Sequence, residues 1–226
     1  LSLAKKDCDI LFKNKPTINF NCPIHPKQSG FNIFVKNGFN YKQCKICFSI
    51  YNSPRHKNEI YNSFYKNGKS VEFWSTEFYK KTAQSRKEKL WKPKVKSLIN
   101  NPILERPITE YSVVDIGGGY GMFAEILKEE KPKNIFVIEP NVNLADICRK
   151  KGINVIEKFF NEIHKEDLPK GSKIFTSFEL IEHLHNPRGF LLSLRKIMEP
   201  GDVLYMTTLT SSGIDIKELK SKSKAI

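Results

Sequence analysis

Two pairs of residues that bind soft metal ions lie near the start of the chain, Cys22-Pro23-Ile24-His25 and Cys44-Lys45-Ile46-Cys47. The 18 residues between the pairs contain Asn37-Gly38, a dipeptide that is typical of a hairpin turn. Two such loops joined by a hairpin bring three thiolates and one imidazole to the corners of a tetrahedron, the geometry that Zn²⁺ prefers. We therefore predict a structural zinc ion held by Cys22, His25, Cys44 and Cys47. The alternative is that the first pair is incidental and the second is a pair of buried thiols.

A glycine-rich turn is the second candidate site. The buried-strand pattern of residues 112–116 runs into Gly117-Gly118-Gly119-Tyr120-Gly121 and then into a helical pattern. Glycines let the backbone turn sharply and approach a ligand closely, at the edge where open α/β sheets bind their ligands. Asp115 stands just before the turn, and Glu139 ends the next strand pattern, where a carboxylate can take both hydroxyls of a ribose. The dinucleotide-binding fingerprint G-x-G-x-x-G is incomplete, because Met122 stands where its third glycine would be. The glycine turn, Asp115 and Glu139 together still favour a bound ligand over a turn that binds nothing.

Acidic residues and histidines follow the strand pattern of residues 173–178, namely Glu179, Glu182, His183 and His185. A carboxylate or an imidazole at the carboxyl end of a strand could act as a general base, so Glu179, Glu182 and His183 are the candidate catalytic residues. Carboxylate oxygens with one imidazole would also suit Mg²⁺ or Mn²⁺. A turn that binds no ion is the reading we prefer over this metal site.

The elements that must position these residues alternate between strands and helices after residue 110. Apolar strand patterns cover 112–116, 134–139, 153–156, 173–178 and 203–208, and helical patterns cover 122–131, 144–151 and 188–198. Buried strands that alternate with helices predict an α/β fold, a parallel sheet covered on both faces. Before this region, residues 76–100 form a lysine-rich helical pattern that Pro93 should break or kink, with most of its cations in solvent.

The motifs resemble those of class I S-adenosylmethionine-dependent methyltransferases. Asp115-x-Gly117-x-Gly119-x-Gly121 resembles their first motif and Ile138-Glu139-Pro140 their second, while residues 177–187 and 198–202 resemble the segments after the fourth strand and before the fifth. The resemblance implies a Rossmann-like sheet and S-adenosylmethionine as cofactor. The residues that it implies for cofactor binding are Asp115, Gly117, Gly119, Gly121, Glu139, Pro140 and Phe178.

The family sheet has seven strands, whereas this chain ends soon after the fifth strand pattern. We therefore expect a C-terminally truncated methyltransferase core, either as a fragment or with segments supplied by another chain. The fifth strand would then be an exposed sheet edge that allows self-association.

The metal-ligand pairs resemble the zinc-binding N-terminal domain of sugar C-methyltransferases and polysaccharide-associated methyltransferases. In those proteins a C-x₂-C pair precedes a C-x₂-C-G segment, whereas here His25 replaces a cysteine and Phe48 replaces the glycine. The E-x-x-E-H segment from Glu179 to His183 resembles ubiquinone-pathway O-methyltransferases and small-RNA 2′-O-methyltransferases, in which these residues hold a divalent ion.

Charge divides the 226 residues into two regions. Residues 1–106 hold 21 Lys and Arg against 7 Asp and Glu, whereas residues 107–226 hold 17 of each, so the net charge of +14 lies in the first region. We predict an N-terminal arm without regular structure and a zinc-binding domain over 1–75, a basic helical linker over 76–106, and the S-adenosylmethionine-binding core over 107–226. The basic region should attract phosphates, nucleic acid or acidic glycans, unless its lysines only solubilise the chain.

These features together predict transfer of a methyl group from S-adenosylmethionine to a small or carbohydrate-linked acceptor, such as a nucleotide sugar or a surface-polysaccharide precursor. The alternatives are an RNA methyltransferase and a non-catalytic, cofactor-binding interaction module. Five cysteines suit a reducing compartment, and the sequence has neither a signal-peptide pattern at its start nor a membrane-spanning apolar run. We therefore expect a cytoplasmic protein without a membrane span.

Overall fold

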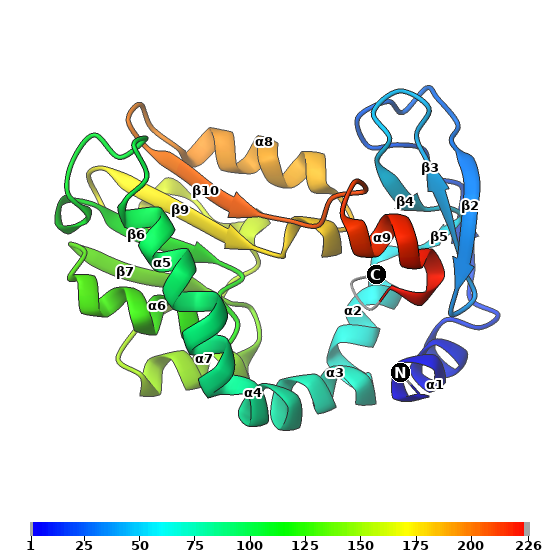
Figure 1. Cartoon of the computed structure of the whole chain (residues 1–226), viewed down its shortest axis with the longest axis horizontal. Coiled ribbons are helices and arrows are strands. Elements are labelled where there is room, and N and C mark those ends of the chain that lie inside the picture. Colours follow the sequence, from blue (N-terminus) through cyan, green and yellow to red (C-terminus); the bar gives the residue numbers. More distant parts are fainter. Residues whose placement is uncertain (1, 224–226) are drawn as a thin grey trace. The chain divides into compact units, whose positions relative to one another are not determined.

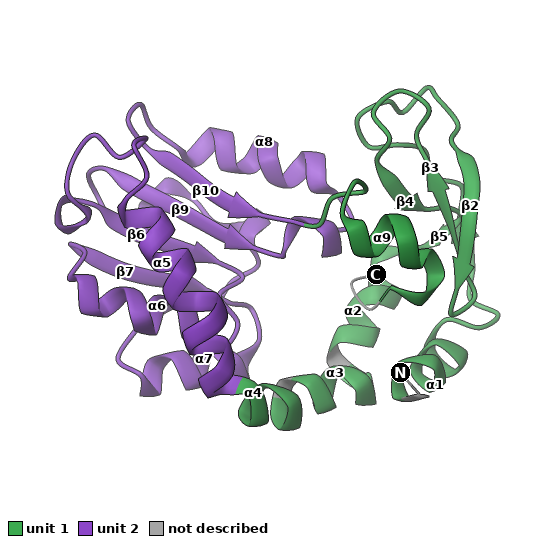
Figure 2. Ribbon diagram, in the orientation of Figure 1, with its two compact units in different colours: residues 1–82, 209–226 green, residues 83–208 purple. Residues whose placement is uncertain are grey.

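The computed structural model describes residues 2–223 and divides into two compact units, which Figure 2 distinguishes by colour. Unit 1 comprises residues 1–82 and 209–226, and unit 2 comprises residues 83–208. The domain boundaries predicted after residues 75 and 106 differ from the boundaries of these units, which follow residues 82 and 208. Residues after 208 belong to unit 1 because α9 (Ile214–Leu219) is followed by a turn whose Ser223 carbonyl accepts a hydrogen bond from Lys36. No helix in the described part of the chain is long and apolar enough to cross a membrane.

Unit 2 is built on a parallel sheet with the strand order β10-β9-β6-β7-β8 (Figure 1). The strands are β6 (Ser112–Ile116), β7 (Asn134–Ile138), β8 (Asn154–Ile156), β9 (Lys173–Phe178) and β10 (Val203–Thr207). They agree with the predicted strands to within one residue at each end, because each is a short apolar run between turn residues. The predicted α/β fold with a Rossmann-like parallel sheet is confirmed.

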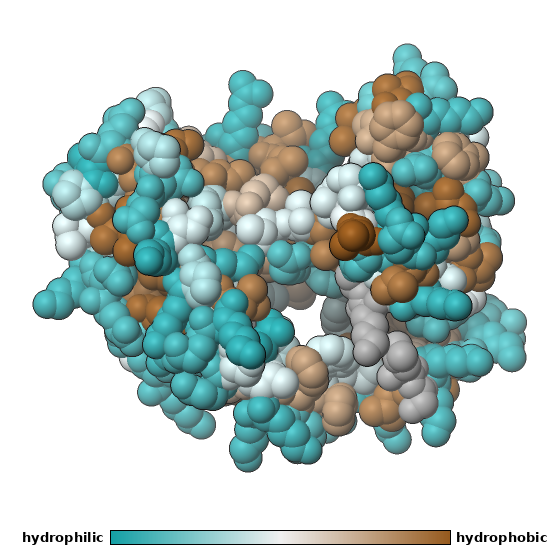
Figure 3. Space-filling view, in the orientation of Figure 1, coloured by the Kyte–Doolittle hydropathy of each residue, from teal (hydrophilic) through white to brown (hydrophobic). Residues whose placement is uncertain are grey.

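Helices cover both faces of this sheet, since successive strand residues point to opposite sides. Val113 and Ile174 pack with α5 (Lys92–Ile99), α6 (Met122–Leu127) and α7 (Val142–Lys150) in one core. Val114 and Phe175 pack with α8 (Pro187–Ile197) in the other core. The outer surfaces of α5, α6 and α7 are hydrophilic in Figure 3.

The sheet order places a topological switch point at the glycine turn. The chain passes from β6 to β7 and β8 on one side, and returns to β9 and β10 on the other side of β6. The connections that leave the carboxyl ends of β6 and β9 therefore diverge, and open α/β sheets bind ligands at this switch point.

The basic helical pattern is longer than predicted and Pro93 does not interrupt it. Helical conformation begins with α3 (Lys69–Phe73) and continues through α4 (Tyr79–Arg86) to α5, with π-helical turns at Trp74–Phe78 and Lys87–Trp91. The second π turn ends just before α5, so Pro93 lies in a first helical turn, where a residue without an N–H donor is tolerated.

Unit 1 contains an antiparallel sheet of β2 (Phe31–Lys36), β3 (Phe39–Gln43) and β4 (Ile50–Asn52), and a pair formed by β1 (Thr17–Ile18) and β5 (Arg55–His56). Asn37 and Gly38 join β2 to β3 with φ angles of 50° and 85°, which confirms the predicted hairpin turn.

The start of the chain is not the unstructured arm that was expected. It forms α1 (Ser2–Leu11), which adjoins α2 (Asn58–Asn67) and α3. Asp7 on α1 is buried, and its carboxylate accepts hydrogen bonds from the N–H groups of Lys69 and Ser70 at 3.2 and 2.7 Å. Asp7 therefore satisfies two free donors at the start of α3, a contact that no local sequence pattern shows.

Candidate functional site

The glycine turn between β6 and α6 has the conformation that its composition predicts. Gly117, Gly119 and Gly121 adopt φ angles of 71°, 54° and 64°, a region that other residues rarely occupy. A Cβ atom on Gly118 would lie 2.8 Å from an Asp115 carboxylate oxygen and 2.9 Å from a methyl of Val137. The turn therefore lies directly against the ends of β6 and β7.

Glu139 closes the turn from the neighbouring strand. One carboxylate oxygen accepts the N–H of Gly119 at 3.0 Å and the other accepts the N–H of Asn141 at 3.0 Å. Burial raises the pKa of Glu139, and these two hydrogen bonds oppose the rise. A carboxylate oxygen can accept more than one donor, so Glu139 can hold the turn and still bind vicinal hydroxyls. Pro140, the next residue, is exposed.

Asp115 lies deeper, at 2% exposure, where it accepts the Thr176 hydroxyl at 2.7 Å. Burial raises the pKa of Asp115 to about 7, the Thr176 hydrogen bond opposes this, and the charge of Glu139 adds to it. Two carboxyl groups of unequal burial thus lie behind the turn. Asp115 has no open access to a ligand, so its position fits support of the turn better than direct contact.

The acidic residues after β9 are held by hydroxyl groups at the end of β10. Glu179 accepts the Thr207 hydroxyl at 2.8 Å, and its N–H donates to the Thr207 carbonyl at 2.9 Å. Glu182 accepts the Thr208 hydroxyl at 2.9 Å through one oxygen. Its other oxygen is buried and has no partner among residues 2–223. Glu179 also has a φ of 51°, a strained conformation of the kind that occurs at functional sites.

His183 is placed differently from the two carboxylates. It is exposed, and within residues 2–223 its side chain forms no hydrogen bond. The structure does not bring Glu179, Glu182 and His183 together as a set of metal ligands in the described part of the chain.

Two residues of the preceding helical segment also reach this edge of the sheet. Lys94 donates a hydrogen bond to the Thr207 hydroxyl at 2.6 Å, and its ammonium lies 4.7 Å from the centre of the Phe178 ring. Trp91 packs edge-on against Phe178, with ring centres 5.6 Å apart. Neither Lys94 nor Trp91 was predicted as a site residue from the sequence. Lys94 is one of many lysines in the segment of residues 76–100. The available signal is that Trp91, Lys94, Val95 and Leu98 share one helical face.

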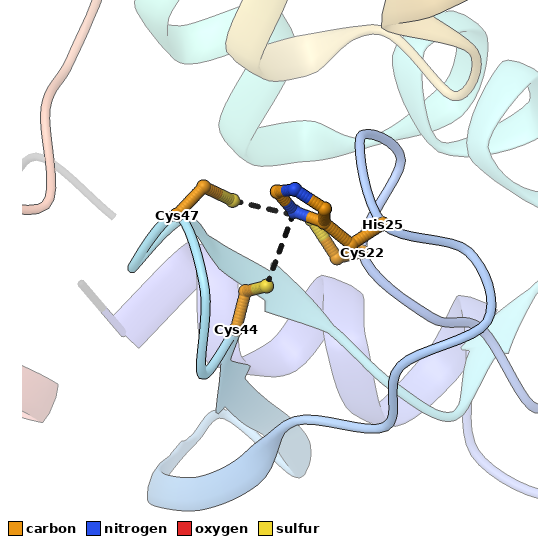
Figure 4. A group of neighbouring side chains, drawn as sticks. All are labelled: Cys22, His25, Cys44 and Cys47. Atoms are coloured by element: carbon orange, nitrogen blue, oxygen red, sulfur yellow. Dashed lines mark hydrogen bonds between the residues drawn. The ribbon is translucent and has the colours of Figure 1, made fainter.

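The predicted metal ligands of unit 1 come together from two loops, as Figure 4 shows. The ligand atoms of Cys22, His25, Cys44 and Cys47 all lie within 4.8 Å of one another, and Cys22 and Cys44 are fully buried. The Sγ atoms of Cys22 and Cys47 are 3.5 Å apart, and Nδ1 of His25 lies 3.6 and 4.0 Å from Sγ of Cys44 and Cys22.

These separations fit a tetrahedral zinc site. With bonds of about 2.3 Å to sulfur and about 2.0 Å to nitrogen, ligand atoms lie about 3.8 Å apart for two sulfurs and about 3.6 Å apart for sulfur and nitrogen. Burial alone would raise the pKa of the Cys47 thiol, but hydrogen bonds with Ser49, Cys22 and His25 hold that pKa at about 6, whereas burial raises the pKa of the neighbouring Cys22 thiol to about 11. Cys47 is thus ready to ionise, as a metal ligand must.

Comparison with known families gives one match over most of the chain. A family model described as "Methyltransferase domain" matches residues 76–223. Among curated proteins, the mitochondrial ubiquinone biosynthesis O-methyltransferase of Dictyostelium discoideum is 24% identical over 126 residues, which are 50% of this chain and 39% of that protein. The ubiquinone biosynthesis O-methyltransferase of Agrobacterium fabrum (strain C58 / ATCC 33970) is 23% identical over 129 residues, or 56% and 49%. The matched part of this chain spans less than half the length of either relative.

Solved structures extend the likeness of fold. The plantazolicin methyltransferase BamL, crystallised in complex with a triazolic desmethylPZN analogue and S-adenosylhomocysteine, superposes with a TM-score of 0.55 at 16% identity. The match covers 72% of this chain and 59% of that one. The related BpumL bound to S-adenosylhomocysteine gives 0.54 at 15% identity, with 70% and 60% covered. At this level of identity the likeness concerns the fold.

Proposed function

Because this chain belongs to the methyltransferase domain family, we propose that it transfers a methyl group from S-adenosylmethionine to a small or carbohydrate-linked acceptor. The observation that carries the proposal is the pairing of the glycine turn with Glu139 at the switch point of the sheet. Glu139 contacts the turn through Gly119 and retains carboxylate lone pairs for a ribose. We assign the cofactor to Gly117, Gly119, Gly121, Glu139, Pro140 and Phe178, with Asp115 behind the turn.

The cofactor supplies an activated methyl group on a sulfonium, so the chain's own task is to orient an acceptor and to remove its proton. Glu179, Glu182 and His183 are the three candidates for that proton. Glu182 fits well because its buried oxygen has no partner among the described residues and can accept a donor. His183 would take the proton of an acceptor that binds in a more open position, because the His183 side chain is exposed.

We also propose that the Cys22, His25, Cys44 and Cys47 cluster holds a structural zinc ion. Four ligands complete a tetrahedron and leave no position for a reacting oxygen, so this metal would stabilise unit 1 and take no part in methyl transfer. The support is the agreement of the observed ligand separations with a zinc site.

The proposed acceptor class is supported by the charge of the segment around the metal cluster. Residues 10–58 hold eight Lys and Arg and no Asp or Glu. This segment contains the whole metal cluster and β1 to β5. A segment with cations alone favours an acceptor with an anionic handle, such as the diphosphate of a nucleotide sugar or a polysaccharide precursor.

The test is an acceptor screen with the purified chain. Release of S-adenosylhomocysteine is measured by mass spectrometry with nucleotide-diphosphate sugars, the same sugars without the nucleotide, and a structured RNA. We expect turnover with a nucleotide-linked sugar and much less with the free sugar. Turnover on RNA alone would contradict the acceptor class, and tight cofactor binding without turnover on any acceptor would favour an interaction module.

A further inference from the structure

Large apolar side chains are exposed on the two loops of unit 1 that hold the cysteine–histidine cluster. Ile24, in the loop of residues 22–25, is 63% exposed, and Ile46, in the loop of residues 44–47, is 52% exposed. Phe48 directly follows the second loop and is 60% exposed. These three residues form what we call the loop-tip surface. Figure 3 shows apolar side chains at the end of unit 1 where the loops before β2 and after β3 lie.

The cluster holds the two loops against each other, since its four ligand atoms lie within 4.8 Å of one another (Figure 4). The N–H of Ile46 donates to Sγ of Cys44 at 3.5 Å, and the N–H of Ile24 likewise forms a hydrogen bond with Cys22. The backbone of each isoleucine therefore faces the cluster, and its exposed side chain points away from it. Two apolar tips thus project from one small rigid unit.

Phe48 adds an apolar ring at a position where the backbone disfavours one. Its φ angle is 58°, a left-handed conformation that is strained for a bulky residue. Two hydrogen bonds fix this conformation, because the N–H of Phe48 donates to the Cys44 carbonyl at 3.2 Å and its carbonyl accepts the Gln43 side-chain amide at 3.0 Å. Glycine would adopt the same conformation without strain and would expose no ring. A contact outside the described chain accounts for a phenylalanine here.

The charge around the loop-tip surface indicates the chemistry of that contact. Lys45 lies within the second loop and Lys27 follows the first, and both are exposed. They belong to the segment of residues 10–58, which holds eight Lys and Arg and no Asp or Glu. The occupant must therefore combine an apolar layer with negative charge.

A lipid bilayer with anionic headgroups has both properties. Apolar side chains enter the boundary between headgroups and acyl chains, and neighbouring lysines are attracted to the headgroup phosphates. A single-stranded nucleic acid fits less well, because isoleucine side chains cannot stack on bases. A protein partner would have to supply a pocket for each protruding tip, whereas a bilayer deforms around them.

We propose that the loop-tip surface, with Lys27 and Lys45, docks unit 1 on an anionic lipid surface. The inference goes beyond the proposed function and does not depend on it, because a chain that docks without transferring methyl groups would satisfy it. Docking of this kind would bring the chain to acceptors that are linked to a lipid.

The test is co-sedimentation of the purified chain with vesicles of phosphatidylcholine alone, or of equal parts phosphatidylcholine and phosphatidylglycerol. The variants are Phe48→Gly, Ile46→Ser and Lys45→Gln. Phe159→Gly is the control for loss of a ring, because Phe159 is 53% exposed and lies in unit 2. Lys150→Gln is the control for loss of a cation, because Lys150 is exposed in the same unit.

We expect the wild type to partition at least about 10-fold more strongly onto the anionic vesicles, with a preference that declines as salt is added. Phe48→Gly and Ile46→Ser should each lower that partition coefficient about 3- to 10-fold, as expected for a half-exposed apolar side chain that leaves water on docking. Lys45→Gln should lower it by a similar factor, and the two controls should change nothing. Because glycine relieves the strain at position 48, Phe48→Gly should resist urea at least as well as the wild type, so its lost binding cannot reflect unfolding.

A wild type that does not sediment with anionic vesicles would overturn the inference, as would equal partition of the wild type and Phe48→Gly. Binding to single-stranded RNA that is weakened by Phe48→Gly, without binding to vesicles, would assign the loop-tip surface to nucleic acid and would also overturn it.

Discussion

Replacement of Asp115 by asparagine should remove a pH dependence from the stability of unit 2. Asp115 is 2% exposed, and burial is the main cause that raises its pKa from 3.8 to about 7. At pH values between 3.8 and about 7, the Asp115 carboxyl group keeps its proton in the folded protein and has lost it in the unfolded chain. The unfolding free energy therefore falls as the pH rises from about 4 to about 7, and it stays lower above pH 7.

The size of this fall follows from the two pKa values. A difference of about three powers of ten in proton affinity corresponds to about 4 kcal/mol of unfolding free energy. The asparagine side chain cannot ionise, and its oxygen can still accept the Thr176 hydroxyl that Asp115 accepts. The change in stability between pH 4.5 and pH 8 should therefore shrink by several kcal/mol in Asp115→Asn, whatever the variant's absolute stability.

Tryptophan fluorescence can isolate unit 2 for this measurement. The chain has two tryptophans, so in a Trp74→Phe background Trp91 alone reports urea unfolding of residues 83–208. The control is Asp146→Asn, because Asp146 is exposed and pairs with Arg149 on the surface. An Asp115→Asn variant with the same pH dependence as its parent would refute the argument that Asp115 is protonated in the folded protein near neutral pH.

Three further predictions follow from the sites. Glu139→Ala should weaken S-adenosylhomocysteine binding by about 1–3 kcal/mol in calorimetry, because hydrogen bonds to the ribose and to Gly119 are lost; an unchanged dissociation constant would remove Glu139 from the site. Elemental analysis should find about one zinc per chain, and a chelator should unfold unit 1 while the far-UV signal of unit 2 persists. Protein purified without chelators that contains no zinc would contradict the metal assignment. Neutralising the exposed Lys80, Lys81, Lys89 and Lys92 should leave acceptor affinity unchanged, and salt-sensitive submicromolar binding to generic RNA would contradict this expectation.

The parts of the fold that the sequence predicts well are those with strong local signals. The strand over residues 112–116 is marked by the apolar residues Val113, Val114 and Ile116, and the Asn37-Gly38 turn has few alternatives, so both are found where expected. The metal ligands were predicted because ligand spacing is itself a local pattern. Contacts between distant residues leave no such pattern. The helix α1 depends on Asp7 reaching residues 69 and 70, and the uninterrupted helix at Pro93 depends on a π turn before it.

The candidate site likewise combines residues that local motifs predict with residues that only contacts between distant segments bring there. Gly117, Gly119 and Glu139 belong to motifs and were predicted as a group, and the hydrogen bond from Gly119 to Glu139 joins them. Most cations of the 76–100 segment were expected in solvent, because lysine is among the least buried residues, and nothing local marks Lys94 as an exception. Only the packing of α5 on the sheet turns Lys94 toward Thr207 and Phe178.

The most direct test of the central claim is calorimetric titration of the purified chain with S-adenosylmethionine, S-adenosylhomocysteine and NAD. The account predicts one site per chain for both sulfur compounds, with low-micromolar dissociation constants, and no comparable binding of NAD. Tight binding of NAD without binding of either sulfur compound would contradict it.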